Sequence, residues 1–240
     1  MVRRTSIGGA PSLRGGIILF ALVAIAHAAD APLDPAAVIQ QVDAAVQARV
    51  RAIAGYTVTE HYSVFHGTDE VHPVAEMTVK TTYRKETGKS YEVLSQSGSA
   101  LIRRLGLDPL LDSEKNINLP GNVQHAWIDS ENYNMKLKPG TPVLDGRTCY
   151  VLEIDPKRKA PNLIVGSLWV DAKDGSIVRL EGVASKAPSV FAGVTHMMRQ
   201  YAMVEGFSMA THARAESSTF LYGRTVVTID YSGYKIDVKM

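Results

Sequence analysis

Residues 148–184 constrain the fold most, because they hold three consecutive strand patterns separated by turn signals. The first strand runs over about 148–155 and stops at Pro156, since proline cannot donate to a central ladder. The second and third, about 163–171 and 176–184, are joined through an Asp-Gly pair, a hairpin signal because glycine accepts positive φ. A chain with this centre folds around an antiparallel sheet.

Further strand patterns lie on both sides of this centre. Residues 74–84 alternate cleanly between apolar and polar, which is typical of a strand with one buried face. Residues 132–137 are expected to pair with the strand over 148–155. Together with the remaining patterns the sequence predicts about ten strands, nearly all sequential neighbours; the others run over 56–65, 90–96, 190–204, 209–222 and 224–234.

Helices are expected at only two points. Asp34 as N-cap and Pro35 in the first turn open an amphipathic helix over about 35–54. A second, short helix over 99–111 is expected to be broken by Pro109 and to lie over the sheet as a lid, whereas 112–130 carry no clear pattern. Its candidate ligand-binding side chains are Leu101, Ile102, Leu105, Leu110 and Leu111.

A long twisted antiparallel meander with one apolar face must curl. The expected fold is therefore α+β and mainly β: an unclosed antiparallel β-barrel, or half-barrel, with an N-terminal helix and a helical lid or plug. One late strand has mostly small residues on one face, with Met209 and Thr211 followed by Ala213 and Ala215. Small side chains on a concave face leave room for a ligand, or alternatively for the first helix. We take Ala213, Ala215 and Trp169 as candidate cavity residues.

The N-terminus has the features of a secretory signal peptide. Three arginines precede an apolar run over 15–26, and Ala26-His27-Ala28 is an A-x-A cleavage site. Cleavage after Ala28 would leave one domain over 29–240; the alternative is an uncleaved anchor. No later segment is long and apolar enough to span a bilayer.

Charge and cysteine content exclude several classes of protein. The chain has 26 basic and 24 acidic residues, and removing the signal leaves 23 against 24, which gives no support for nucleic-acid binding. The single cysteine, Cys149, excludes an intramolecular disulfide and a cysteine-based zinc site, and its place in a strand favours a buried apolar role. No cysteine lies at the cleavage site to carry a lipid anchor.

We find no pattern that indicates catalysis. His61, His66 and His72 lie near acidic residues, but their spacings match no standard metal motif. Nucleophile-elbow and phosphate-loop motifs are absent from the sequence. We therefore expect no catalytic residue, no metal and no cofactor, and a protein that is not an enzyme.

One basic cluster follows the first central strand: Lys157, Arg158 and Lys159. These residues form either a solvated loop or a docking patch. In the second case, each basic residue near an anionic lipid surface contributes about 1 kcal/mol.

The order of these elements resembles the lipoprotein-sorting proteins of the LolA/LolB type and the related RseB N-terminal domain. Local stretches carry the resemblance: 131–133, 149–152 with 156–158, 166–171 and 177–182. The resemblance implies an apolar cavity for the acyl chains of a lipoprotein or another lipid, reached under the lid. It also implies a soluble, monomeric periplasmic carrier, LolA-like because it lacks an N-terminal cysteine, which would meet donor and acceptor proteins at the inner and outer membranes.

Three functions remain open at this stage. A large apolar cavity behind a lid would favour a carrier that moves lipid towards the outer membrane. A packed interior with an exposed apolar patch would favour a sensor or interaction module of the same fold. A polar cleft that holds a histidine and a carboxylate would favour a periplasmic hydrolase.

Overall fold

The structure is a computed structural model that describes residues 34–187, 192–219 and 223–239. The expected signal peptide lies outside these residues, as do positions 190–191 and 220–222 of the expected strands. Within the described part, no helix has the length and apolarity needed to cross a membrane.

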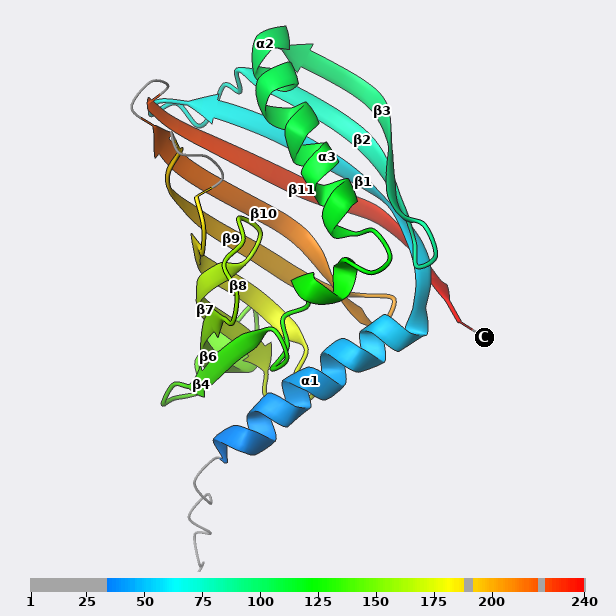
Figure 1. Ribbon diagram of the computed structural model, residues 1–240, viewed down its shortest axis with the longest axis vertical. Coiled ribbons are helices and arrows are strands. Elements are labelled where there is room, and N and C mark those ends of the chain that lie inside the picture. Colours follow the sequence, from blue (N-terminus) through cyan, green and yellow to red (C-terminus); the bar gives the residue numbers. More distant parts are fainter. Residues whose placement is uncertain (1–33, 188–191, 220–222, 240) are drawn as a thin grey trace, which may run out of the picture. The chain divides into compact units, whose positions relative to one another are not determined.

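Within the described residues, eleven antiparallel strands form one sheet. Figure 1 shows that the sheet is strongly curved. Their order is β3-β2-β1-β11-β10-β9-β8-β7-β6-β4, and the short β5 pairs with β6. The described strands at the two ends, β3 and β4, do not pair with each other, which confirms the expected unclosed half-barrel with one strand more than expected. The strands are β1 (Ile53–His66), β2 (Ala75–Arg84), β3 (Gly88–Gly98), β4 (Tyr133–Leu137), β5 (Val143–Leu144), β6 (Arg147–Pro156), β7 (Ile164–Asp171), β8 (Ile177–Ala184), β9 (Ala192–Val204), β10 (Phe207–Thr219) and β11 (Gly223–Val238).

The N-terminal helix α1 (Pro35–Ala52) forms as the sequence predicts. The Asp34 side chain accepts a hydrogen bond of 3.0 Å from the Ala36 N–H, and proline occupies the first turn, where no N–H is needed. Val38 and Val42 are the buried residues of α1. They pack against apolar side chains of β4, β6, β7 and β8 in a cluster that we name the α1 core.

The second helical segment is longer than expected. It consists of α2 (Ala100–Ile102), the π-helical η1 (Arg103–Leu107) and α3 (Asp108–Ile117), followed by η2 (Val123–Ala126). The expectation that Pro109 breaks the helix is wrong, because Pro109 stands in the first turn of α3, where its missing N–H is tolerated. The first part of the patternless stretch, up to Ile117, is therefore helical.

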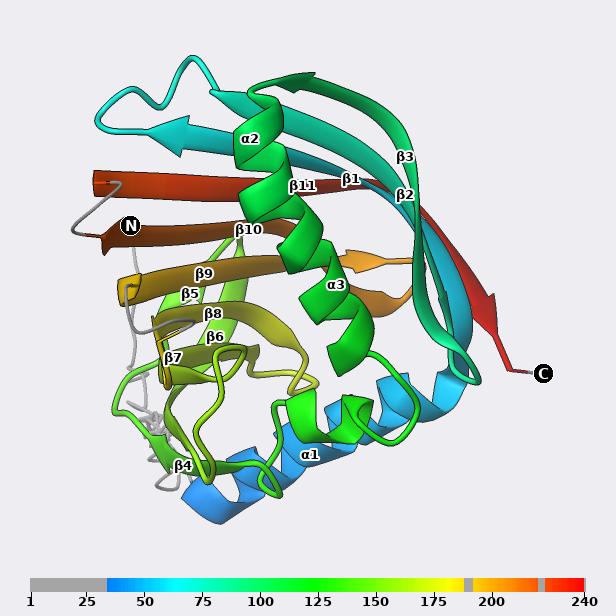
Figure 2. The same cartoon turned by 45° about the horizontal axis from the view of Figure 1, so that its top comes forward.

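Both views show α2, η1 and α3 crossing the concave side of the sheet, while α1 runs along its lower end (Figures 1 and 2). Leu107 and Leu111 pack against β1 and β2 in a second cluster, the α3 core. Its sheet members are Tyr62, Val64, Ala75, Met77 and Val79.

Strand pairing defines the side chains of the concave face. One row of cross-strand neighbours runs through Tyr62, Ile229, Ala213, Arg199, Leu180, Leu168 and Leu152. An extra residue in β10, Thr211, shifts the register between Ala210 and His212. Simple alternation is interrupted at this point, although Met209 and Ala213 on either side of it are both buried.

Candidate functional site

The apolar side chains expected in the lid divide into three groups. Leu111 is buried in the α3 core, and Ile102 and Leu110 are half-buried against it. Leu101 and Leu105 are 66% and 63% exposed and point away from that core. The segment therefore has an apolar inner side and two large apolar residues in contact with solvent.

The three candidate cavity residues do not share a face. Ala213 is buried on the concave face, and Ala215 lies two residues further along the same strand. Trp169 instead lies on the convex face, because its neighbours Leu168 and Val170 occupy the buried face, and it stacks under Arg179 at 5.6 Å. The expectation that Trp169 lines the cavity is corrected accordingly.

A buried ion pair ties α3 to the edge of the sheet. Lys89 of β3 and Glu114 of α3 are 3.0 Å apart, with side chains only 12% and 25% exposed. The charge of Lys89 lowers the pKa of Glu114 to about 2. Burial alone would lower the pKa of Lys89, but Glu114 and other nearby acidic groups outweigh it and raise that pKa. Each partner therefore keeps the other ionised inside the fold.

A second buried carboxylate lies on β1. Glu60 is 2% exposed and accepts a hydrogen bond of 2.5 Å from the Tyr62 hydroxyl. Burial and the neighbouring Glu60 raise the pKa of Tyr62. Alternation along the strand places position 60 on the buried face between Val58 and Tyr62. The burial of Glu60 could therefore have been predicted from the sequence.

Arg199 supplies a second cation on the concave face. It donates to the hydroxyl of Tyr201, and Tyr201, Tyr231 and Glu114 raise its pKa against the opposing effect of burial. The two cations and two carboxylates belong to four different elements, so sequence spacing gave no sign that they meet. The concave face therefore has a polar band of balanced charge beside its apolar area.

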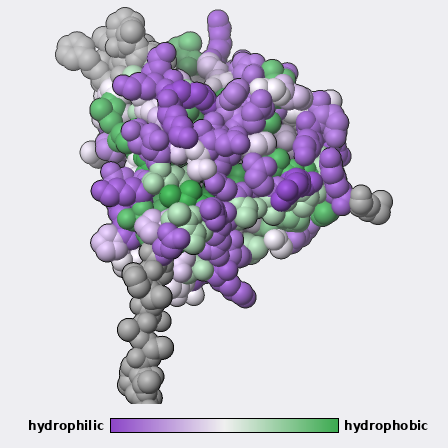
Figure 3. Space-filling view, turned by 60° about the horizontal axis from the view of Figure 1, so that its bottom comes forward, coloured by the Kyte–Doolittle hydropathy of each residue, from purple (hydrophilic) through white to green (hydrophobic). Residues whose placement is uncertain are grey.

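A pocket of about 320 Å³ opens where α1 meets the lower ends of β8, β9 and β10. Its walls are mostly apolar: Ala45, Val46, Ala48 and Ala52 from α1, with Ile177, Tyr201, Met203 and Phe207 from the sheet. Figure 3 brings this side of the molecule forward and shows apolar patches between polar residues. A pocket of this size is at the small end of ligand-binding cavities.

Few polar groups border this pocket. Arg49 and Asp174 stand at its rim, and no ion pair joins them among the described residues. The Arg49 Nε atom is buried and has no hydrogen-bond partner in the described part of the chain. A buried donor without a partner is costly, and Arg49 is the basic residue among those that line the pocket.

The basic cluster lies in the loop between β6 and β7. Lys157 donates to the Ser130 carbonyl at 2.7 Å, and Arg158 donates to the His125 carbonyl. Both side chains are exposed and also hold the loop that precedes β4, whereas Lys159 is exposed without a hydrogen bond to the described residues. Only part of this cluster is free for docking.

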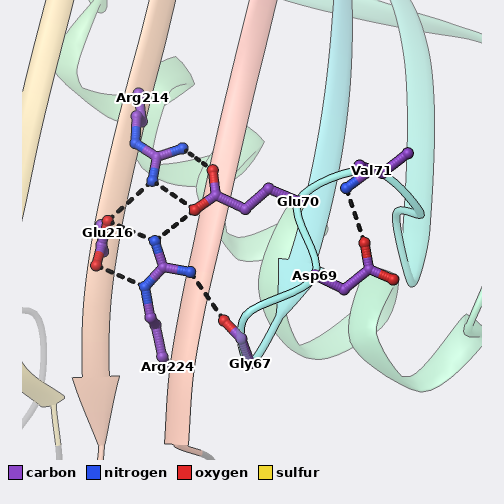
Figure 4. A network of polar contacts seen from close by, with 7 residues as sticks. All are labelled: Gly67, Asp69, Glu70, Val71, Arg214, Glu216 and Arg224. Atoms are coloured by element: carbon purple, nitrogen blue, oxygen red, sulfur yellow. Dashed lines mark hydrogen bonds and ion pairs between the residues drawn. The ribbon is translucent and has the colours of Figure 1, made fainter.

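On the convex face, a network of four charged residues secures the loop after β1 (Figure 4). Glu70 accepts from Arg214 at 2.6 Å and also from Arg224, while Glu216 accepts from both arginines. The hydrogen bonds from Arg214 and Arg224 lower the pKa of Glu70 to about 2. Every charge here has a partner, so the network is a structural clamp.

Another convex-face cluster contains the residue types of a hydrolase but not the required geometry. Ser63 Oγ and Glu76 Oε1 both approach His61 Nε2, at 3.3 and 3.4 Å, while Thr78 Oγ1 lies 3.0 Å from Nδ1. A catalytic triad needs the serine and the carboxylate on different ring nitrogens. This group is therefore not arranged as a triad.

No protein-family model matches the chain, and neither does a curated protein sequence. Solved structures with a similar fold include a LolA superfamily protein from Nitrosomonas europaea, with 12% identity, a TM-score of 0.45 and coverage of 85% of this chain and 94% of that one. A lipoprotein-sorting domain from Vibrio parahaemolyticus, described as putative and outer-membrane, has 12% identity, a TM-score of 0.46 and coverage of 83% and 92%. A DUF1329 family protein from Desulfovibrio piger has 16% identity, a TM-score of 0.42 and coverage of 87% and 95%.

Proposed function

We propose that this protein is a non-enzymatic periplasmic carrier that binds acyl chains of a lipoprotein or another lipid. The observation that carries the proposal is the open, mostly apolar pocket between α1 and the sheet. Each acyl CH₂ removed from water contributes about 0.8 kcal/mol, so a lined apolar pocket is the feature that such a ligand requires.

The rest of the proposal follows the sequence. A signal peptide cleaved after Ala28 would release one domain over 29–240 into the periplasm as a monomer. Donor and acceptor proteins at the inner and outer membranes would load and unload it, with the 157–159 loop as a docking patch. Larger cargo would need α3 to move away from the concave face, because α3 and its core occupy that space.

The test is acyl binding by protein purified without detergent. We expect dodecanoate to bind, as measured by displacement of a fluorescent fatty-acid probe and by native mass spectrometry. Ala45→Phe should fill the pocket and abolish binding, whereas Ala44→Phe, on the neighbouring and exposed position of the same helix, should not. Equal binding by both variants would contradict the proposed site.

One observation favours an interaction module instead. Val93 and Leu94 are about half exposed on the edge strand β3, and Leu101 and Leu105 are exposed on the segment that follows it. Large apolar residues that remain exposed are found at protein-binding surfaces. If no acyl probe binds while Leu101→Asp and Leu105→Asp abolish capture of a periplasmic partner, this second function is the better one.

A further inference from the structure

We infer that the pocket between α1 and the sheet takes a single-chain amphiphile with an anionic head, and that Arg49 binds the head. This inference rests on the proposed function and names its ligand class. Three features carry it: the volume of the pocket, the nature of its walls and the state of Arg49.

The volume limits the number of chains. At about 30 Å³ for each water-sized group, 320 Å³ accommodates on the order of ten such groups. Inside the pocket, that matches one medium-length acyl chain. Because the pocket is partly open, the polar end of a longer ligand remains at the rim.

The walls favour a flexible chain over a flat or polar ligand. The α1 side consists of small residues, which form a shallow track, and the opposite side has Ile177, Met203 and Phe207. Met203 is 48% exposed although it faces this apolar track. A methionine side chain adapts its shape to ligands of variable length.

Arg49 fixes the sign of the head group. Arg49 lines the pocket, and no carboxylate of the described residues pairs with its guanidinium. Asp174, the acidic residue at the rim, instead accepts a hydrogen bond of 2.9 Å from the Ser176 N–H. A carboxylate or phosphate would provide the counter-charge for the Arg49 guanidinium, and planar guanidinium groups bind both in a bidentate manner.

This site differs from the polar band of the concave face. There Lys89 is paired with Glu114, so that cation is not available to a ligand. Tyr201 lines the pocket and accepts a hydrogen bond from Arg199, which separates the two regions. A single chain therefore binds without displacement of α3.

The experiment compares ligands and variants by calorimetry at pH 7. The ligands are dodecanoate, dodecyl phosphate, uncharged dodecanol and a short-tailed diacyl phosphatidylglycerol. The variants are Arg49→Met, Arg49→Lys and the control Arg51→Met, which changes an exposed arginine in the same last turn of α1. Circular dichroism verifies that each variant folds.

We expect Arg49→Met to weaken binding of the anion at least tenfold, since a hydrogen bond to a charged group has about that effect, while dodecanol binding stays unchanged. Arg49→Lys should retain part of the affinity, and Arg51→Met all of it. The ratio of dodecanoate to dodecyl phosphate affinity identifies the head group. Equal anion binding by wild type and Arg49→Met, or tighter binding of the diacyl lipid, overturns the inference. Failure of all four ligands to bind wild type overturns the proposed function itself.

Discussion

Helices α1 and α3 both cover the concave side of the sheet, yet different forces hold them there. Helix α1 packs through Val38 and Val42, which are 4% and 0% exposed in an apolar cluster. Helix α3 packs through Leu111, together with Leu107 of the preceding turn, and through the ion pair between Glu114 and Lys89. The contact of α1 with the sheet is therefore apolar, whereas the contact of α3 with the sheet is partly ionic.

This difference predicts that α1 stays on the sheet in the native state and that α3 can detach from it. Burial of each large apolar side chain stabilises the fold by about 1.5–3 kcal/mol. This free energy is lost when the side chain is exposed to water, because water offers it no compensating interaction. Ionic groups regain hydration when they separate, so an ion pair adds little net stability although breaking one partner is costly. We therefore expect α1 to leave the sheet only on global unfolding and α3 to leave it by local opening.

The largest effect should come from a charge in the α1 core. Val42→Asp places an unpaired carboxylate at a site that is 0% exposed, so we expect a loss of about 3–5 kcal/mol in the free energy of unfolding. Urea denaturation measures it. Ala44→Asp, on the exposed side of α1, should cost less than about 1 kcal/mol; similar losses in both variants would mean that α1 is loosely packed.

A smaller effect is expected from the ion pair. Glu114→Gln or Lys89→Met alone leaves a largely buried charge without its partner and should cost about 1–3 kcal/mol. Replacing both residues by apolar ones, Glu114→Leu with Lys89→Met, should cost less than the two single changes combined. Additive costs in this double-mutant cycle would show that the pair does not couple α3 to the sheet.

Acid should loosen α3 before α1. The pKa of Glu114 is lowered from 4.5 to about 2 in the folded protein, so its contribution to stability is complete above pH 4.5 and is lost as the pH falls towards 2. Glu70 and Asp69 titrate in the same range. The measurement is therefore the difference between wild type and Glu114→Gln in hydrogen exchange of α3 from pH 5 to pH 2.5. If the difference in α3 exchange between wild type and Glu114→Gln stays the same as the pH falls, ionised Glu114 does not stabilise the contact of α3 with the sheet.

The smallest effect concerns the exposed leucines. Leu105→Ser should change the free energy of unfolding by no more than about 0.5 kcal/mol, because the side chain is 63% exposed. Leu111→Ser, in the α3 core, should cost about 2–4 kcal/mol. If Leu105→Ser proves equally costly, then η1 packs more tightly than its exposure indicates.

Local sequence patterns predicted most of the fold. The N-cap and first-turn proline located α1, and period-two alternation located the central strands and their faces. Trp169 was taken as a candidate cavity residue, whereas the burial of its neighbours Leu168 and Val170 places it on the opposite face. The register shift at Thr211 lies outside such patterns, since an extra residue depends on the partner strand.

The candidate site was only partly predictable. The expected lid residues do not line the pocket at α1, and the meeting of Lys89 with Glu114 joins positions that have no local relation. Arg49 was part of the predicted helix, and nothing in the sequence indicates that its Nε atom is buried beside a pocket. Long-range contacts of this kind depend on how the sheet curves, which the local pattern does not determine.

Native-state hydrogen exchange with mass spectrometry tests the central claim most directly. Peptides from 36–50 report on α1 and peptides from 104–117 on α3, each measured in increasing amounts of denaturant below the unfolding transition. We predict that α3 exchanges through a local opening whose rate hardly depends on denaturant, and that α1 exchanges only with the free energy and denaturant dependence of global unfolding. Exchange of both helices through the same global event, or of α1 before α3, would contradict the account.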